Sequence, residues 1–202
     1  MMDILDIKKH KTIIVDLGCG KTYDGFGSPL CEKWYNKHMC YLGFDIDKNH
    51  ITKLKRKFGK KINRNHYYFQ VLDIINNPLP LDDDSIDEIH CHMLQPNIEF
   101  QQPKGFELQL FQEVHRILKE GKKFYFSCDS SFFRRNSNEV TNEDYDLLIE
   151  EMGNIFDENN VRIKFNLAVD KKDKYVCMVR KELENYTHYP RNTRFYAVCG
   201  KS

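Results

Sequence analysis

Short apolar runs alternate along the chain with longer segments in which apolar residues recur every three or four positions. The short runs are rich in β-branched and aromatic residues, as in TIIVDL (12–17), and are typical of buried strands. The longer segments are typical of amphipathic helices; the one at 105–121 is expected to end at Gly121 and to bury Leu108 and Phe111. The pattern predicts strands at 12–17, 39–46, 66–74, 85–94, 122–128, 161–169 and 193–201, and helices at 28–38, 49–58, 105–121 and 142–156.

This alternation of strand and helix predicts a doubly wound α/β sheet. Residues 170–192 fall between the last two predicted strands, and they fit either a helix or a further hairpin. No internal repeat and no low-complexity linker divides the chain. We therefore expect residues 1–202 to form a single domain.

The composition narrows the class of protein. The 202 residues are 41% hydrophobic, enough for one buried core, and 31 Lys and Arg nearly cancel 30 Asp and Glu. The net charge therefore indicates neither a nucleic-acid nor a membrane partner. Seven cysteines without a C-x-x-C pair argue against zinc and against a disulfide scaffold, and they fit a reducing compartment. Apolar runs fall far short of the roughly 20 residues of a membrane span, so we expect a cytoplasmic protein without a membrane partner.

Carboxylates, histidines and glycines occur where the predicted strands end. In an open α/β sheet, ligands bind beyond the carboxyl ends of the strands. These residues are Asp16, Gly18 and Gly20 after the first strand, Asp45 after the second, Asp73 after the third, His90 and His92 in the fourth, and Asp129 after the fifth. A lone Asp at a strand end is usually a turn former or a helix cap. Carboxylates at three successive strand ends favour a shared ligand instead.

The turn after the first strand indicates which ligand this is. Gly18 and Gly20 permit close approach of the backbone, but the third glycine of a dinucleotide site is replaced by Tyr23. Asp16 would repel a pyrophosphate, whereas it suits a cationic amino group. Asp45 follows Gly20 by 25 positions, close to the roughly 20-residue spacing of a ribose-binding carboxylate. Asp73 and the backbone of Ile74 could then read an adenine edge, so the set describes S-adenosylmethionine and requires no metal.

Five segments, in this order, resemble the motifs of class I S-adenosylmethionine-dependent methyltransferases of the methyltransferase type 11-like group. The segments are VDLGCGK, GFDID, VLDIINNPLPLDDDSID, DEIHCHMLQ and LFQEVHRILKEGKKFYFS, and together they span about residues 12–130. The resemblance implies a Rossmann-like fold with a mostly parallel seven-stranded sheet and an antiparallel C-terminal strand. The chain departs from the family pattern where Thr22 replaces a common third glycine, where Gln95 with Pro96 replaces a common Glu-His pair, and where Lys122 replaces the second glycine of a GG pair.

The same resemblance implies a site for S-adenosyl-L-methionine. Residues around the methionine moiety would be Asp16, Gly18, Cys19 and Gly20, with His90 nearby; Asp45 and Ile46 would hold the ribose side, and Asp73 and Ile74 the adenine. Methyl transfer from a sulfonium depends mostly on alignment, and a hydroxyl or ammonium acceptor also needs a general base. His90 and His92 are the first candidates for this base, and Asp129 is the third.

The acceptor remains open between classes. The form of the fourth-strand and following helix motifs resembles enzymes acting on hydroxyls of sugars or small molecules, so a glycan or small-molecule acceptor is weakly favoured and RNA is the alternative. The chain lacks the N/D-P-P-Y/F motif, which disfavours amino methylation of adenine or cytosine. Acceptor contacts are expected from loops near 129–141 and 170–192, where aromatics and arginines mix. The basic run at 48–64 fits a nucleic-acid patch, although a solvated helix face is favoured.

Two further hypotheses stay open from the sequence. A cofactor-binding but inactive partner subunit would share the same fold and the same strand-end residues. A nicotinamide dehydrogenase would share the glycine turn, and binding of NAD against S-adenosylhomocysteine would separate it from a methyltransferase.

Overall fold

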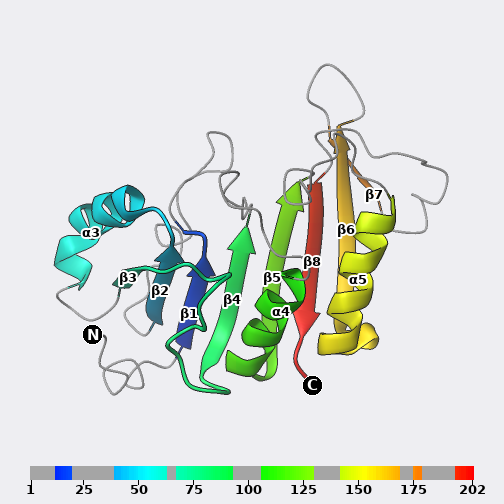
Figure 1. Ribbon diagram of the computed structural model, residues 1–202, viewed down its shortest axis with the longest axis horizontal. Helices are drawn as coiled ribbons and strands as arrows, with labels where there is room; N and C mark the ends of the chain where they lie inside the picture. The colour runs from blue at the N-terminus through cyan, green and yellow to red at the C-terminus, as the bar shows by residue number, and fades with distance from the viewer. Residues whose placement is uncertain are drawn as a thin grey trace.

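The computed structural model describes residues 12–19, 39–62, 67–92, 106–129, 142–168, 175–178 and 194–202. Within these ranges eight strands form one sheet in the order β3-β2-β1-β4-β5-β8-β6-β7 (Figure 1). The strands are β1 (Thr12–Leu17), β2 (Met39–Asp45), β3 (Tyr67–Val71), β4 (Ile86–His92), β5 (Leu118–Asp129), β6 (Val161–Ala168), β7 (Tyr175–Met178) and β8 (Arg194–Gly200). The described helices are α3 (Lys48–Ile62), α4 (Phe106–Ile117), α5 (Asn142–Phe156) and the short 3-10 helix η2 (Glu158–Asn160).

The sheet confirms the predicted fold class. Strands β3, β2, β1, β4 and β5 run parallel, and β8 pairs antiparallel with both β5 and β6. All seven predicted strands are present. The eighth, β7, pairs antiparallel with β6 and lies inside 170–192, in agreement with the hairpin alternative for that segment.

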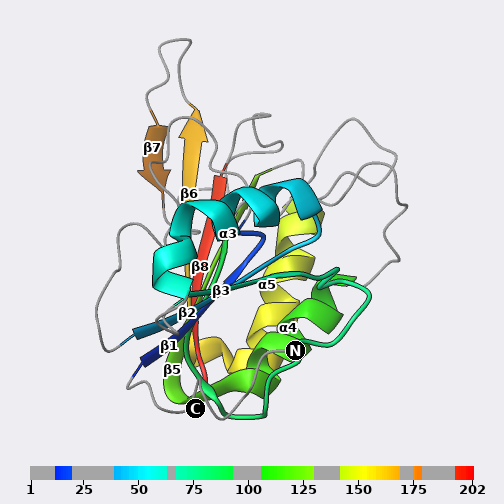
Figure 2. The same cartoon turned by 90° about the vertical axis from the view of Figure 1, so that its left-hand side faces the viewer.

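Helices cover both faces of the sheet, as Figure 2 shows. On one face, alternate strand residues such as Val15, Ile89 and Phe124 join Phe111 of α4 and Met152 of α5 in the larger hydrophobic core. On the other face, a smaller core joins α3 to the β1, β2 and β3 end of the sheet; its members are Ile14, Cys19, Tyr41, Ile51, Leu54, Phe58, Tyr67 and Phe69. Because side chains alternate along a strand, neighbouring residues of β1 contribute to different cores.

The junction between α4 and β5 differs from the prediction. The helix ends at Ile117 and not at Gly121, because the backbone N–H groups of Asp84 and Ser85 donate to the Arg116 and Ile117 carbonyls at 3.0 and 2.9 Å. These bonds close the helix from outside. Leu118 then already belongs to β5 and pairs with Ile86. Gly121 retains a left-handed φ of 69° within the strand irregularity that follows.

The buried face of α4 also differs from the prediction in one residue. Leu108 is 36% exposed, whereas Leu110, Phe111, Val114 and Ile117 are buried. Several predicted segments lie outside the described residues: the helix at 28–38, Gly20, the loop at 130–141 and most of 170–192. Of the loop that begins at residue 129, only the backbone of Asp129 is described, as the last residue of β5.

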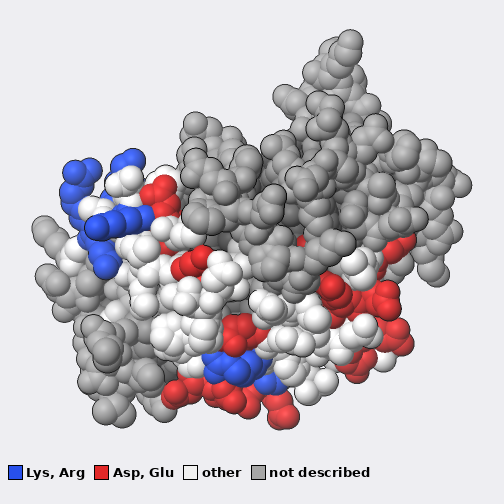
Figure 3. Space-filling view, viewed as in Figure 1, with Lys and Arg blue, Asp and Glu red and all other residues white. Residues whose placement is uncertain are grey.

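Charged side chains are unevenly spread over the described surface. On the face drawn in Figure 3, Lys and Arg cluster over the α3 end of the sheet, and most Asp and Glu lie toward α5 and along the lower edge. No helix in the described ranges is long and apolar enough to cross a bilayer.

Candidate active site

The turn after β1 is held tightly against the end of β2. Gly18 adopts a φ of 76°, and the N–H groups of Gly18 and Cys19 both donate to the Phe44 carbonyl at 2.8 and 3.1 Å. This left-handed conformation explains why glycine stands at position 18. The Cys19 side chain packs inward, where a Cβ at Gly43 would lie only 2.7 Å from its Sγ. Cys19 therefore shapes the floor of the turn with its side chain.

Asp16 is a buried carboxyl on the same face of the sheet as the α3 core. The Tyr41 hydroxyl donates to its Oδ2 atom. Burial raises the pKa of Asp16 to about 7, the Tyr41 bond works in the opposite direction, and the nearby Asp45 charge raises it further. A positive charge close to this buried carboxyl would lower its pKa and stabilise its ionised form.

Asp45 is the last residue of β2, one residue before the predicted strand end at Ile46. Asp45 Oδ1 accepts from the Asp47 N–H at 2.7 Å, and Asp47 in turn accepts from the Asn49 N–H at 2.7 Å as the cap of α3. Ile46 is 48% exposed and Val71, the registered partner of Asp45 on β3, is 43% exposed. A carboxylate beside two exposed aliphatic side chains can accept hydroxyl hydrogens while an apolar ring packs alongside.

Asp73 organises the turn that follows β3. Its Oδ1 accepts from the Ile75 N–H at 3.1 Å and its Oδ2 from the Asn76 side-chain amide at 2.7 Å, so it acts as a turn former. The Ile74 side chain joins the larger core. Its N–H donates to no acceptor within the described residues, so it stays available to a ligand acceptor.

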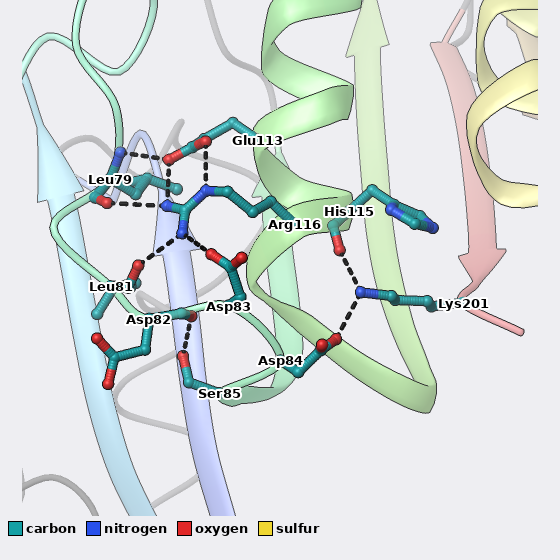
Figure 4. A network of polar contacts seen from close by, with 10 residues as sticks. All are labelled: Leu79, Leu81, Asp82, Asp83, Asp84, Ser85, Glu113, His115, Arg116 and Lys201. Carbon is teal, nitrogen blue, oxygen red and sulfur yellow. Dashed lines mark hydrogen bonds and ion pairs between the residues drawn. The ribbon is translucent and has the colours of Figure 1, made fainter.

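A network centred on Arg116 ties this loop to α4 (Figure 4). The guanidinium donates to the carbonyls of Leu79 and Leu81 at 3.1 and 2.9 Å and forms two bonds to Glu113 at 2.6 and 2.8 Å. Glu113 also accepts from the Leu79 N–H at 2.7 Å. The loop motif that contains Leu79 and Leu81 and the α4 motif that contains Glu113 and Arg116 therefore contact each other. This contact holds in place the segment that carries Asp73 and Ile74.

Four polar side chains form a continuous hydrogen-bonded chain on β4 and β5. His90 Nε2 lies 2.5 Å from Glu88 Oε1, and His90 Nδ1 lies 3.1 Å from His92 Nε2. The chain ends at Ser127 Oγ, 2.9 Å from His92 Nδ1. Tyr125 stacks on the His90 ring with centroids 4.8 Å apart and planes 8° apart.

This chain is largely buried, which sets its protonation. His90 is 4% exposed and Ser127 3% exposed. Burial lowers the pKa of both histidines to about 4, and the His90 charge lowers that of His92 as well. Burial raises the pKa of Glu88, and Lys122 and Lys123 oppose that rise. At neutral pH the histidines are uncharged, so each ring has one donor and one acceptor nitrogen and can pass a proton on.

The predicted site residues fall into three groups. Asp16 and His90 are registered partners on β1 and β4, so the structure brings the first and fourth strand ends together. Asp45 ends β2 and Asp73 follows the adjacent strand β3, with Ile46 and Ile74 next to them in the sequence. Gly20 lies outside the described residues, as does the side chain of Asp129. The roles of all the predicted site residues stay predictions.

Sequence reasoning missed Glu88, Ser127 and Tyr41. Glu88 could have been found from the period of a strand, since it shares a face with His90 and His92. Ser127 and Tyr41 could not, because each reaches its partner only through the register between two strands distant in sequence. Among the described residues no group of three or more His, Cys, Asp or Glu side chains is placed to hold a metal ion.

The sequence match and the fold together define a methyltransferase of the class I fold. The chain belongs to the methyltransferase-domain family, which its sequence matches over residues 8–181. None of the curated proteins compared with the chain matches it.

Solved structures show the same fold at low sequence identity. The chain is similar to the 16S rRNA (adenine(1408)-N(1))-methyltransferase from Catenulisporales acidiphilia, with 14% identity, a TM-score of 0.60 and coverage of 100% of this chain and 94% of that one. It is similar to a TehB-like SAM-dependent methyltransferase from Corynebacterium glutamicum, with 14% identity, a TM-score of 0.53 and coverage of 98% and 85%. The [4+2]-cyclase SpnF gives 11% identity, a TM-score of 0.59 and coverage of 98% and 79%. Proteins on this fold thus differ in acceptor and even in reaction, so the acceptor must be argued from the site.

Proposed function

We propose that the protein transfers a methyl group from S-adenosylmethionine to a hydroxyl of its acceptor, with the acceptor proton leaving through His92, His90 and Glu88. The hydrogen-bonded chain on β4 and β5 is the observation that carries this proposal. A hydroxyl that has accepted a methyl group becomes a strongly acidic oxonium, so its proton must leave during the transfer. An amine product, in contrast, can lose its proton to water afterwards.

The residues around the strand ends fit the cofactor. Asp16 would meet the amino group of the methionine moiety near Gly18, Cys19 and Gly20, and Asp45 would accept from the ribose hydroxyls. Ile46 would pack against the base, while Asp73 and the Ile74 N–H would read its edge. When bound, S-adenosylmethionine would supply the methyl group on a positively charged sulfur, which is a good leaving group.

The proposed proton path runs from the acceptor hydroxyl through His92 and His90 to Glu88. In the resting arrangement His92 Nδ1 accepts from Ser127 Oγ–H, and His92 Nε2–H donates to His90 Nδ1. His90 Nε2–H donates in turn to the Glu88 carboxylate. The acceptor hydroxyl takes the place of Ser127 beside His92 Nδ1 and gives up its proton there. Each histidine then passes on the proton of its other nitrogen, and Glu88 ends the step as a neutral carboxylic acid.

Two acceptor classes fit a hydroxyl site, a sugar or small molecule and the ribose of RNA. A screen with radiolabelled S-adenosylmethionine against glycan, small-molecule, RNA and protein pools tests the proposal, with Asp45→Ala as the blank. We expect label in one hydroxyl-bearing pool and a methyl ether when that product is identified by mass spectrometry. An N-methyl or C-methyl product would contradict the proposal, as would equal labelling by wild type and blank, which would instead support the inactive partner subunit.

Asp129→Asn belongs in the same screen because Asp129 is the alternative base at the end of β5. A loss of activity in this variant with full activity in Glu88→Gln would assign the base to Asp129 and reject the histidine path.

A further inference from the structure

We propose that the exposed face of α3 binds the phosphate backbone of RNA. This helix has 15 residues, seven of them Lys or Arg and none of them acidic. Its apolar residues Ile51, Leu54 and Phe58 are buried in the smaller core. The exposed cations within the described side chains are Lys48, Lys53, Lys55, Arg56 and Lys57. This set, called here the α3 basic face, gives the Lys and Arg cluster seen in Figure 3.

The α3 basic face is unfavourable for the helix itself. Lys53 and Lys57 are one turn apart, as are Lys53 and Arg56, and like charges at such spacings destabilise a helix. Lys48 stands in the first turn, where the helix dipole favours an acid. Neither Lys53 nor Arg56 forms an ion pair with a described residue. A negative partner outside the chain would offset the repulsion among these side chains.

The side chains of the α3 basic face favour a nucleic-acid backbone over a membrane surface or a protein as the partner. A helix that binds a membrane surface inserts its apolar face, and here that face is consumed by packing of Phe58 against Tyr67 and Phe69. A protein interface would centre on exposed aromatic or aliphatic anchors, and each described apolar side chain of α3 is buried. Binding of a nucleic-acid backbone needs only Lys and Arg side chains directed at phosphates.

The position of α3 connects this surface to the site. The helix starts directly after Asp45, Ile46 and the capping Asp47, at the carboxyl end of β2. From β2 the sheet continues to β1 and then β4, which ends at His92. Two strand spacings separate β2 from β4, about 10 Å. An RNA strand bound along α3 would therefore pass within a few nucleotides of His90 and His92. The choice of RNA over DNA rests on the proposed function, because the 2′-hydroxyl of RNA is a hydroxyl acceptor.

Fluorescence anisotropy with a labelled single-stranded RNA of mixed sequence, titrated at several salt concentrations, tests the proposal. The variant Lys53→Gln/Arg56→Gln removes two charges from the α3 basic face. The variant Arg162→Gln/Lys164→Gln removes one Arg and one Lys that are also exposed, on β6. Binding of S-adenosylhomocysteine, measured by calorimetry, checks that both variants are folded.

We expect wild type and the β6 variant to bind RNA alike, and the α3 variant to bind at least tenfold more weakly at low salt. The slope of log K against log salt should fall by about 1.4 in the α3 variant, since each lost phosphate contact on a single strand removes about 0.7. No RNA binding by wild type, equal binding by both variants, or stronger binding to phosphatidylserine vesicles than to RNA would overturn the proposal. Failure of methyl transfer with intact, α3-dependent RNA binding would reject the proposed function and leave this inference standing.

Discussion

The two faces of the sheet around β4 and β5 are built from different chemistry. On the α4 and α5 side, Ile89, Cys91, Phe124 and Phe126 join a continuous apolar core. On the opposite side, the residues one position away form the chain from Glu88 to Ser127. A strand can serve both purposes because its side chains alternate. The apolar face supplies stability, and the polar face holds two histidines that burial keeps uncharged at neutral pH.

Breaking the polar face should have the largest effect on activity. Glu88→Gln keeps an oxygen that accepts from His90 Nε2–H but cannot take up the proton, so kcat should fall by roughly 10²–10⁴-fold with little change in the KM for S-adenosylmethionine. Initial rates on the acceptor found in the screen measure this. Tyr125→Phe is the matched control, since it keeps the ring stacked on His90 and removes only a hydroxyl. Full kcat in Glu88→Gln would exclude the proton path.

Breaking the apolar face should have the largest effect on stability. Phe124 is fully buried and contacts Phe111, Phe126 and Phe156. Phe124→Ala should lower the free energy of unfolding by about 3–5 kcal/mol, because it removes buried area and leaves a cavity. Urea denaturation measures the loss. Ser127→Ala, on the other face of the same strand, should cost about 1 kcal/mol; equal costs for the two variants would contradict the division between the faces.

The pH dependence of stability sharpens the comparison at Asp16. Its pKa is raised to about 7, so between about pH 4 and 7 the folded protein holds a proton that the unfolded chain has lost. The stability tied to the neutral carboxyl is present below about pH 4 and is lost as the pH rises through 7. Relative to Asp16→Asn, wild type should lose up to about 1.4 kcal/mol per pH unit in this window.

Urea denaturation of wild type and Asp16→Asn at several pH values makes this measurement. The two histidines work in the opposite direction: their pKa of about 4 is lowered, so their contribution is present above about pH 6.5 and lost as the pH falls through 4. Both proteins carry these histidines, so their contribution cancels in the difference. Parallel stability curves for the two proteins would show that the Asp16 carboxyl is not held neutral by burial.

A smaller effect is expected at the glycine beneath the turn after β1. In Gly43→Ala the new Cβ would lie 2.7 Å from Cys19 Sγ and 2.8 Å from Phe69 Cδ1, so the free energy of unfolding should fall by about 1–3 kcal/mol. Gly59→Ala is the control, because a Cβ there meets nothing within 4 Å and should stabilise α3 by up to about 1 kcal/mol. Adding Cys19→Ala to Gly43→Ala should recover part of the loss; no recovery would locate the strain at Phe69.

Much of the fold could be predicted from the sequence, because most helices and strands follow from the local pattern of apolar and polar residues. The bounds of β1 and α5 agree with the prediction, and the strand ends with Asp16, Asp45 and Asp73 lie along one edge of the sheet as expected. The predicted end of α4 at Gly121 was wrong, because hydrogen bonds from Asp84 and Ser85 end the helix at Ile117. The histidine pair could be predicted from alternation along one strand, whereas Ser127 depends on the register of β4 with β5.

The place of β8 has a consequence for how the molecule is assembled. Residues 194–200 lie between β5 and β6 in the sheet although they follow both in the sequence. Until they are in place, the parallel strands end at an open β5 edge and the β6–β7 hairpin presents a second one, and open edges invite pairing between molecules. Long-range strand pairing of this kind is slow to form. Insertion of β8 therefore covers two open strand edges at once, and a weakened β8 should reduce soluble yield before it affects the chemistry at β4.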